Sequence, residues 1–267
     1  MGKIDDIQAY KEWTEYHRSL KRDKAADNLS PVERKKKLEK LEANVIEWIL
    51  FFFSEFAKYP FTKFHKKAIK RITTNMEWYE VLSWSRELAK STIVFMCMMY
   101  LVLTGKKKNV LLISNSHENA VRLLEPYKKA FESNSMLKAY YGDLREFGSW
   151  TADEFTLTTG ATFRAIGALE SPRGTRKDAV RPDTALVDDF DTDADCRNPD
   201  ILKKKWEWFE EALFPTRSIS EDLLVIFCGN LIALDCCVKR AGDKADHWDI
   251  VNIRDKDGKS SWPEKNT

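Results

Sequence analysis

The sequence has few of the residues that build covalent cross-links or metal sites. Its 267 residues include 5 cysteines and 4 histidines, and no two cysteines have the C-x-x-C spacing. This scarcity excludes a disulfide framework and a zinc site, and it favours a reducing environment. The most apolar run, Ile93–Leu103, is too short to cross a bilayer, and the charged N-terminus lacks the apolar core of a signal peptide. We therefore expect a buried helix in a soluble protein.

An excess of one charge is also missing. The net charge is +2, although the chain has 44 Lys and Arg and 42 Asp and Glu residues. No overall field directs the chain to nucleic acid, so any basic surface must be local. The length and the 43% hydrophobic content suit one large domain, or one domain with an appendage.

Glycine is missing where a phosphate-binding loop normally has it. The stretch "SWSRELAKST" fits G-x-x-x-x-G-K-[ST] (Walker A) only at Lys90 and Ser91, because Trp84 and Ala89 occupy the glycine positions. Such a lysine binds the β- and γ-phosphates, and such a hydroxyl ligates Mg²⁺ at the helix N-terminus. The alternative is an ordinary helix start.

The hydrophobic pattern predicts helices followed by alternating strands and helices. Ser30-Pro31-Val32-Glu33 combines an N-cap, a first-turn proline and a capping-box glutamate, and we expect its helix to continue to Phe52. The basic stretch Arg34–Lys37 should form a solvated face of this helix, with contact to DNA or a partner as the alternative. Further helices are expected at 90–103, 117–131 and 199–213, and strands at 80–83, 109–114, 155–157, 162–166, 184–187 and 223–228. The strands at 155–157 and 162–166 should form a hairpin, and the chain after about Ala241 reads as a polar tail. Strand and helix alternation argues for a parallel sheet.

Two of these strands end in polar residues. "TALVDDFDTD" ends in Asp188, suited to holding Mg²⁺, and in Asp189, suited to orienting a water for attack on a phosphate. The alternative is a solvated acidic loop that caps the helix after Pro199. "LLVIFCGN" ends in Asn230, which could bind a γ-phosphate or form an ordinary turn. Together with the loop, the two strand ends have the order that one nucleotide site requires.

These motifs resemble the ATPase domain of the large terminase subunit, the DNA-packaging motor of tailed bacteriophages. That family has an arginine four residues before the loop lysine, as Arg86 precedes Lys90, so the missing glycines fit it. The likeness continues through "SPRGTRKDAVRPDTALVDDFD", "FCGNLI" and "DGKSSWPEK", and it covers about residues 60–265.

The resemblance implies a fold and a division of the chain. The fold would be an α/β P-loop NTPase of the RecA/ASCE-like class, with a mostly parallel sheet flanked by helices and an N-terminal helical extension. Residues 1–58 would form that extension, and residues 59–267 the ATPase domain. The family's C-terminal nuclease domain has no room here, so no nuclease activity is expected.

The resemblance also implies roles for individual residues. Ser91 and Asp188 would ligate Mg²⁺, and the ATP-binding stretch would comprise Arg86, Glu87, Leu88, Ala89, Lys90, Ser91 and Thr92. The catalytic group would contain Asp189, Arg86, Asn230, Arg173 and Arg176. Asp189 stands where most members have glutamate, so Asp191 is a second candidate base. One of the two arginines Arg173 and Arg176 would act on a neighbouring subunit, with surface charge or a DNA contact as the alternative. Phe64 and His65 are candidates for adenine stacking, with core packing as the alternative.

The function implied is a Mg²⁺-dependent ATPase that drives double-stranded DNA into a procapsid. Its partners would be DNA, the portal protein and the small terminase subunit. The assembled protein would form a homo-oligomeric ring, with a monomer as the alternative in isolation, and it would act in the host cytoplasm without a membrane. The alternatives are another P-loop motor, such as a helicase or a clamp-loader-like ATPase, and a catalytically decayed scaffold that binds DNA or the portal.

Overall fold

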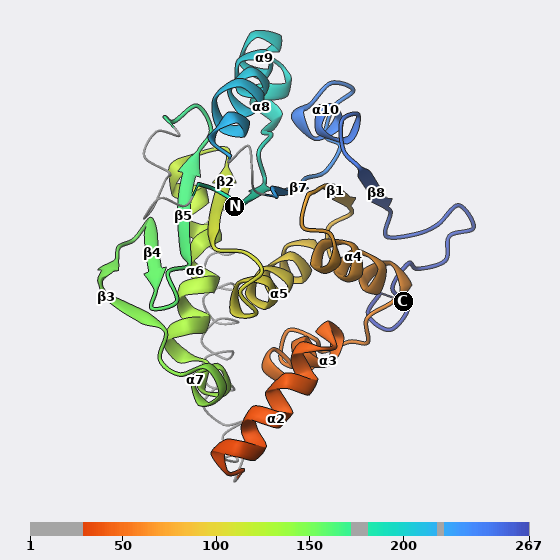
Figure 1. Ribbon diagram of the computed structural model, residues 1–267. Helices are drawn as coiled ribbons and strands as arrows, with labels where there is room; N and C mark the ends of the chain where they lie inside the picture. The colour runs from red at the N-terminus through yellow and green to blue at the C-terminus, as the bar shows by residue number, and fades with distance from the viewer. Residues whose placement is uncertain (1–28, 172–180, 218–221, 267) are drawn as a thin grey trace, which may run out of the picture.

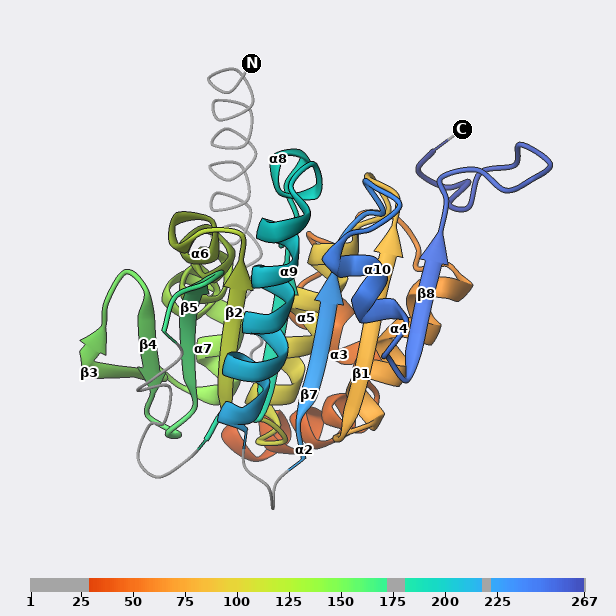
Figure 2. The ribbon, with the colours of Figure 1, turned by 90° about the horizontal axis from the view of Figure 1, so that it is seen from above.

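The computed structural model describes residues 29–171, 181–217 and 222–266. Its centre is an eight-stranded sheet in the order β3-β4-β5-β2-β6-β7-β1-β8 (Figures 1 and 2). The strands are β1 (Trp78–Trp84), β2 (Asn109–Ser114), β3 (Arg145–Trp150), β4 (Glu154–Leu157), β5 (Thr162–Gly167), β6 (Thr184–Asp188), β7 (Leu224–Cys228) and β8 (His247–Val251).

Most neighbours in this sheet are parallel. The six strands from β5 to β8 in spatial order all pair in parallel, whereas β4 pairs antiparallel with β5 and with β3. The expected hairpin is therefore present as β4 and β5. The predicted α/β fold with a mostly parallel sheet is confirmed.

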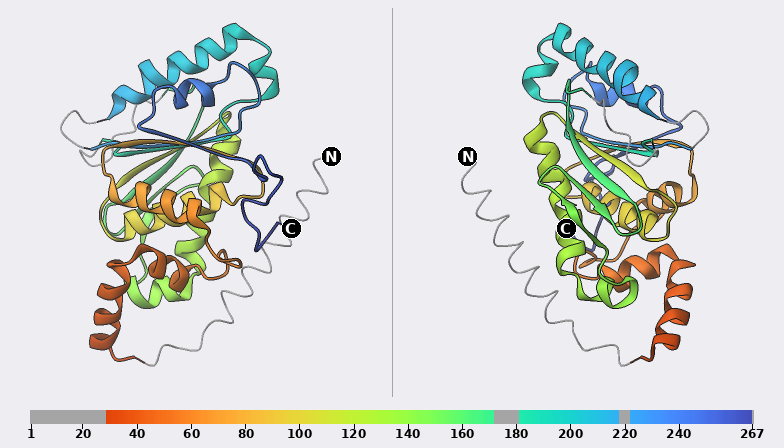
Figure 3. Two further views of the ribbon diagram at one scale, coloured as in Figure 1. Left: turned by 90° about the vertical axis from the view of Figure 1, so that its right-hand side faces the viewer. Right: turned by 60° about the vertical axis from the view of Figure 1, so that its left-hand side comes forward.

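Helices cover both faces of the sheet (Figure 3). One face carries α4 (Lys63–Thr74), α5 (Lys90–Leu103) and α6 (His117–Ser133), with α7 (Ser135–Tyr141) following α6. The other face carries α9 (Pro199–Glu207), which continues as the π-helical turn η1 (Trp208–Leu213), and α10 (Cys237–Gly242). Short helical turns complete this face, namely α8 (Asp193–Cys196) and η2 (Phe214–Thr216). The core is therefore divided by the sheet into two apolar layers.

The N-terminal helices begin as the sequence predicts but are interrupted. Ser30 and Glu33 form the capping box of α2 (Pro31–Glu42). The expected single helix is wrong, because Asn44 caps a second helix, α3 (Val45–Phe52), by accepting from the amides of Ile46 and Glu47. Trp48 of α3 lies 5.4 Å from the ring of Tyr100 on α5, so α3 packs on the same core as the sheet helices. The proposed division at residue 58 stays a prediction.

The chain after Ala241 is not a polar tail throughout. Residues His247–Val251 form β8, which pairs in parallel with β1 at the edge of the sheet. Trp262 is 5% exposed and packs in the core, so the C-terminal segment returns to the molecule. Among the described residues, every helix falls short of what a bilayer-spanning segment would need.

Candidate functional site

The loop between β1 and α5 curls without glycine. Glu87 and Ala89 have φ angles of 71° and 58°, the left-handed region that favours glycine. Each such residue carries a strain of about 1–2 kcal/mol because its Cβ approaches the following carbonyl. The loop backbone thus adopts left-handed conformations that glycine would adopt at a lower energetic cost. Surrounding contacts must hold it there.

Three segments outside the motif hold this loop. Ser85 donates its amide to the Val251 carbonyl of β8 at 2.8 Å. The ring of His65 on α4 donates from Nε2 to the Leu88 carbonyl at 3.0 Å, and the Leu88 side chain is fully buried. Lys265 donates from Nζ to the Glu87 carbonyl at 2.6 Å and to its carboxylate at 2.9 Å. None of these contacts was foreseen from the sequence.

His65 is committed to this structural contact. Its Nδ1 lies 3.2 Å from the Thr62 amide and accepts from it, which places the ring proton on Nε2, facing the Leu88 carbonyl. Burial is the main cause that lowers the pKa of His65, so the ring is neutral. Its ring lies 5.5 Å from that of Trp84 and 4.5 Å from that of Trp262. His65 therefore packs in the core, which was the alternative to adenine stacking. The half-buried Phe64 packs against it, with the two ring centroids 4.0 Å apart.

The acidic strand end meets the start of α5. The Ser91 hydroxyl donates to Oδ2 of Asp188 at 2.6 Å, across 97 residues of sequence. Oδ1 of Asp188 accepts from the Asp189 amide at 3.0 Å. The carboxyl is 8% exposed, and burial raises its pKa to about 6, while the Ser91 hydrogen bond and the charge of Lys90 act in the opposite direction. Among residues 29–171, 181–217 and 222–266, no salt bridge joins this carboxyl to a cation, and a buried acid of this kind is suited to a metal ion.

Sheet register explains why these groups converge. Cys228 of β7 pairs with Leu82 of β1 on one side and with Asp188 of β6 on the other. The loop, the acid and the residues after β7 therefore leave the same carboxyl edge of the sheet. Asn230, half-buried, follows β7 at this edge.

The two candidate bases differ in their surroundings. Asp189 is exposed and has a φ of 46°, a left-handed conformation at the end of β6. Asp191 accepts from the Val238 amide through Oδ2 at 3.0 Å, at the start of α10. Asp191 is thus engaged in capping, whereas Asp189 is open to solvent beside Asp188.

The remaining predicted site residues lie in α5, in the loop before it, or outside the described residues. Lys90 and Thr92 are half-buried in the first turn of α5, and Arg86 is exposed in the loop. Arg173 and Arg176 lie outside the described residues, so their role stays a prediction.

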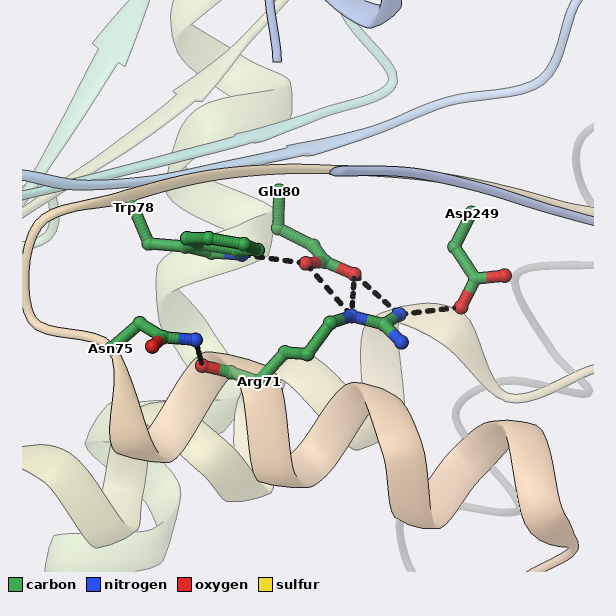
Figure 4. A network of polar contacts seen from close by, with 5 residues as sticks. All are labelled: Arg71, Asn75, Trp78, Glu80 and Asp249. Carbon is green, nitrogen blue, oxygen red and sulfur yellow. Dashed lines mark hydrogen bonds and ion pairs between the residues drawn. The ribbon is translucent and has the colours of Figure 1, made fainter. Parts of the chain in front are cut away.

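A buried ion network supports the strand that leads into the loop (Figure 4). Glu80 of β1 is fully buried, and Arg71 of α4 donates to it at 2.6 Å and to Asp249 of β8 at 2.6 Å. Trp78 donates from Nε1 to the same Glu80 carboxylate at 2.7 Å. Glu80, Asp249 and His247 have the spacing of a metal site, but the Arg71 guanidinium already forms ion pairs with both acids. A charged residue inside an apolar strand, as in "YEVL", was the available signal.

Comparison with known proteins gives a likeness in fold. No protein-family model and no curated protein match the chain. Among solved structures, the HK97 bacteriophage large terminase aligns with a TM-score of 0.49 and 14% identity, over 78% of this chain and 43% of that protein. The large terminase ATPase domain of Thermus phage P74-26 aligns with a TM-score of 0.43 and 15% identity, over 75% of this chain and 83% of that domain. A mutant form of that domain aligns with a TM-score of 0.45 and 14% identity, over 75% of this chain and 84% of that domain. The chain therefore spans less than half of the HK97 protein, and these are the proteins that its motifs predicted it would resemble.

Proposed function

We propose that the chain is the ATPase part of a DNA-packaging motor, which hydrolyses ATP with Mg²⁺ to drive double-stranded DNA into a procapsid. The observation that carries the proposal is the 2.6 Å hydrogen bond between Ser91 and Asp188. It joins the phosphate loop and the acidic strand end at one sheet edge, which is the arrangement that a Mg²⁺-nucleotide site needs. The likeness of the motifs to large terminases supports the choice of motor.

The residues fit a bound magnesium ion and nucleotide. Ser91 and Asp188 offer a hydroxyl and a buried carboxylate, which are hard oxygen ligands of the kind that Mg²⁺ accepts. When bound, the ion would neutralise phosphate charge and orient the leaving group. Lys90, in the first turn of α5 with its charge close to Asp188, would bind the phosphates that approach the helix N-terminus.

Asp189 is the better candidate for aligning the attacking water. Its carboxylate is exposed next to the metal-binding acid, whereas the Asp191 carboxylate accepts from the Val238 amide. Asn230 would bind the γ-phosphate or its water from the end of the neighbouring strand. Arg86 would act as a charge clamp beside the phosphates, and Arg173 or Arg176 would act in a neighbouring subunit of a ring. Partners of that ring would be the portal protein and the small terminase subunit, in the host cytoplasm.

Binding of a fluorescent ATP analogue tests the site directly. The protein should bind the analogue with Mg²⁺, and Lys90→Ala should weaken binding by tenfold or more because a charge-assisted contact worth roughly 1.5–3 kcal/mol is lost. Lys204→Ala is a matched control, because Lys204 is an exposed lysine on α9. Equal binding by wild type and Lys90→Ala, or no binding by either, would favour the scaffold that has lost its nucleotide site.

A further inference from the structure

Helix α4 has two faces of opposite character. Its inward face is buried and comprises His65, Ala68, Ile69 and Ile72. Its outward face carries lysines at the spacing i, i+3, i+4 and i+7, all exposed: Lys63, Lys66, Lys67 and Lys70. In Figure 3 the helix lies on one face of the sheet, next to α5.

The lysines of this face are not neutralised by neighbouring acids of their own helix. Lysines of α6, α9 and α10 form i,i+4 ion pairs, at 3.5 Å for Lys129, 3.6 Å for Lys203 and 3.1 Å for Lys239. The segment "KFHKKAIKRITT" has no Asp or Glu, and within the described ranges no salt bridge joins any of the four α4 lysines to an acid. Arg71, the other cation of α4, is turned inward to Glu80 and Asp249. The outer face therefore keeps its full positive charge.

We propose that the outer face of α4 binds the phosphate backbone of double-stranded DNA. The four lysines extend over about 10 Å of helix, since each residue adds 1.5 Å. A duplex segment of that length carries about six phosphate charges, so the row can contact several phosphates without reading bases. The charge pattern itself points to a polyanion. The choice of DNA rests on the proposed function.

The position of α4 gives this contact a route to the nucleotide loop. The same helix holds the Leu88 carbonyl through His65, at 3.0 Å, and the strand before the loop through Arg71 and Glu80. DNA on the outer face would thus be separated only by α4 from the loop proposed to bind the nucleotide. A displacement of α4 by DNA would therefore change the contacts at Leu88 and at Glu80.

The salt dependence of DNA binding tests the surface separately from ATP hydrolysis. The whole chain is titrated with fluorescent duplex DNA, without nucleotide, between about 50 and 200 mM salt. The variant Lys66→Gln, Lys67→Gln, Lys70→Gln should lower the slope of log K against log salt by roughly 0.9 per lost contact, up to roughly 2.7 in total. Lys35→Gln, Lys36→Gln, Lys40→Gln on α2 removes the same charge from another exposed helix and should change the slope by less than about 1.

Several outcomes decide the proposal. An unchanged slope in the α4 variant, or equal losses in the α2 and α4 variants, would overturn it. A wild-type protein that binds no duplex would also overturn it. The same holds for an α4 variant that keeps DNA binding but loses binding to vesicles of phosphatidylserine. The corresponding Lys→Arg triple variant should retain the slope, because the charge remains. Binding of the fluorescent ATP analogue is measured in the same samples, so loss of the DNA surface and loss of the nucleotide site are distinguished.

Discussion

Asp188 is expected to reduce the stability of the folded protein near neutral pH. Burial raises the pKa of its carboxyl from an ordinary value of 3.8 to about 6, so the folded state holds the proton more tightly than the unfolded state. Stability therefore falls as pH rises between about 4 and 6, and the loss is complete above pH 6. A shift of about 2 units, at 1.36 kcal/mol each, corresponds to a cost of about 3 kcal/mol.

The variant Asp188→Asn removes this cost while keeping the shape of the side chain. Its amide oxygen can accept from the Asp189 amide, and its amide nitrogen can donate to the Ser91 hydroxyl, so both hydrogen bonds persist. In urea unfolding at about pH 7.5 with EDTA, the variant should be more stable than wild type by up to about 3 kcal/mol. The same variant should lose Mg²⁺-dependent nucleotide binding.

The pH profile separates this reasoning from a general packing effect. Because wild-type Asp188 is protonated in both the folded and the unfolded state well below its ordinary pKa of 3.8, the difference between the two proteins should shrink towards zero at about pH 3. A difference of the same size at both pH values, or a variant less stable than wild type at about pH 7.5, would refute the assignment of a buried, charge-disfavouring site.

Substitutions to and from glycine test the backbone of the segments that follow β1 and β7 near this acid. Ala89→Gly should raise the free energy of unfolding by up to about 1 kcal/mol, because φ is 58° at this position, whereas Ala120→Gly inside α6 should lower it by about 1 kcal/mol; a loss at both positions would contradict the strain argument. Gly229→Ala should lower the free energy of unfolding by about 1–3 kcal/mol, because an added Cβ would lie 2.2 Å from Cγ2 of Val238. Adding Val238→Ala should recover most of that loss in the same urea measurement, and an unchanged midpoint in Gly229→Ala alone would contradict it.

The sequence predicts well those elements whose own pattern decides their structure. The helix expected at 90–103 and the strand expected at 109–114 have these bounds in the structure, because both are continuous apolar runs between polar ends. The capping box at Ser30 fixes the start of α2 in the same way. The break at Asn44 was missed because the apolar spacing continues across it, while a side-chain cap decides the local backbone.

Edge strand β8 was missed for a tertiary reason. "HWDIV" has half-buried and exposed positions without a continuous apolar run, so its pattern resembles that of a polar tail. Its hydrogen bonds come from β1, which no local pattern reveals. Through Asp249 and the Val251 carbonyl, this strand contributes to the ion network and to the support of the loop. The missed strand is thus part of the candidate site's foundation.

The conformation of the loop shows why its motif alone was ambiguous. Glycine would let the backbone curl at little cost, whereas Glu87 and Ala89 adopt left-handed conformations that are strained in isolation. The strain is offset by contacts from α4, β8 and the C-terminal segment, which reach the loop at Leu88, Ser85 and Glu87. Each contact comes from a segment distant in sequence or on the far side of a strand. In this chain, the information that glycine would carry within the motif lies instead in the packing around it, so a search for glycines at positions 84 and 89 overlooks a loop that is curled all the same.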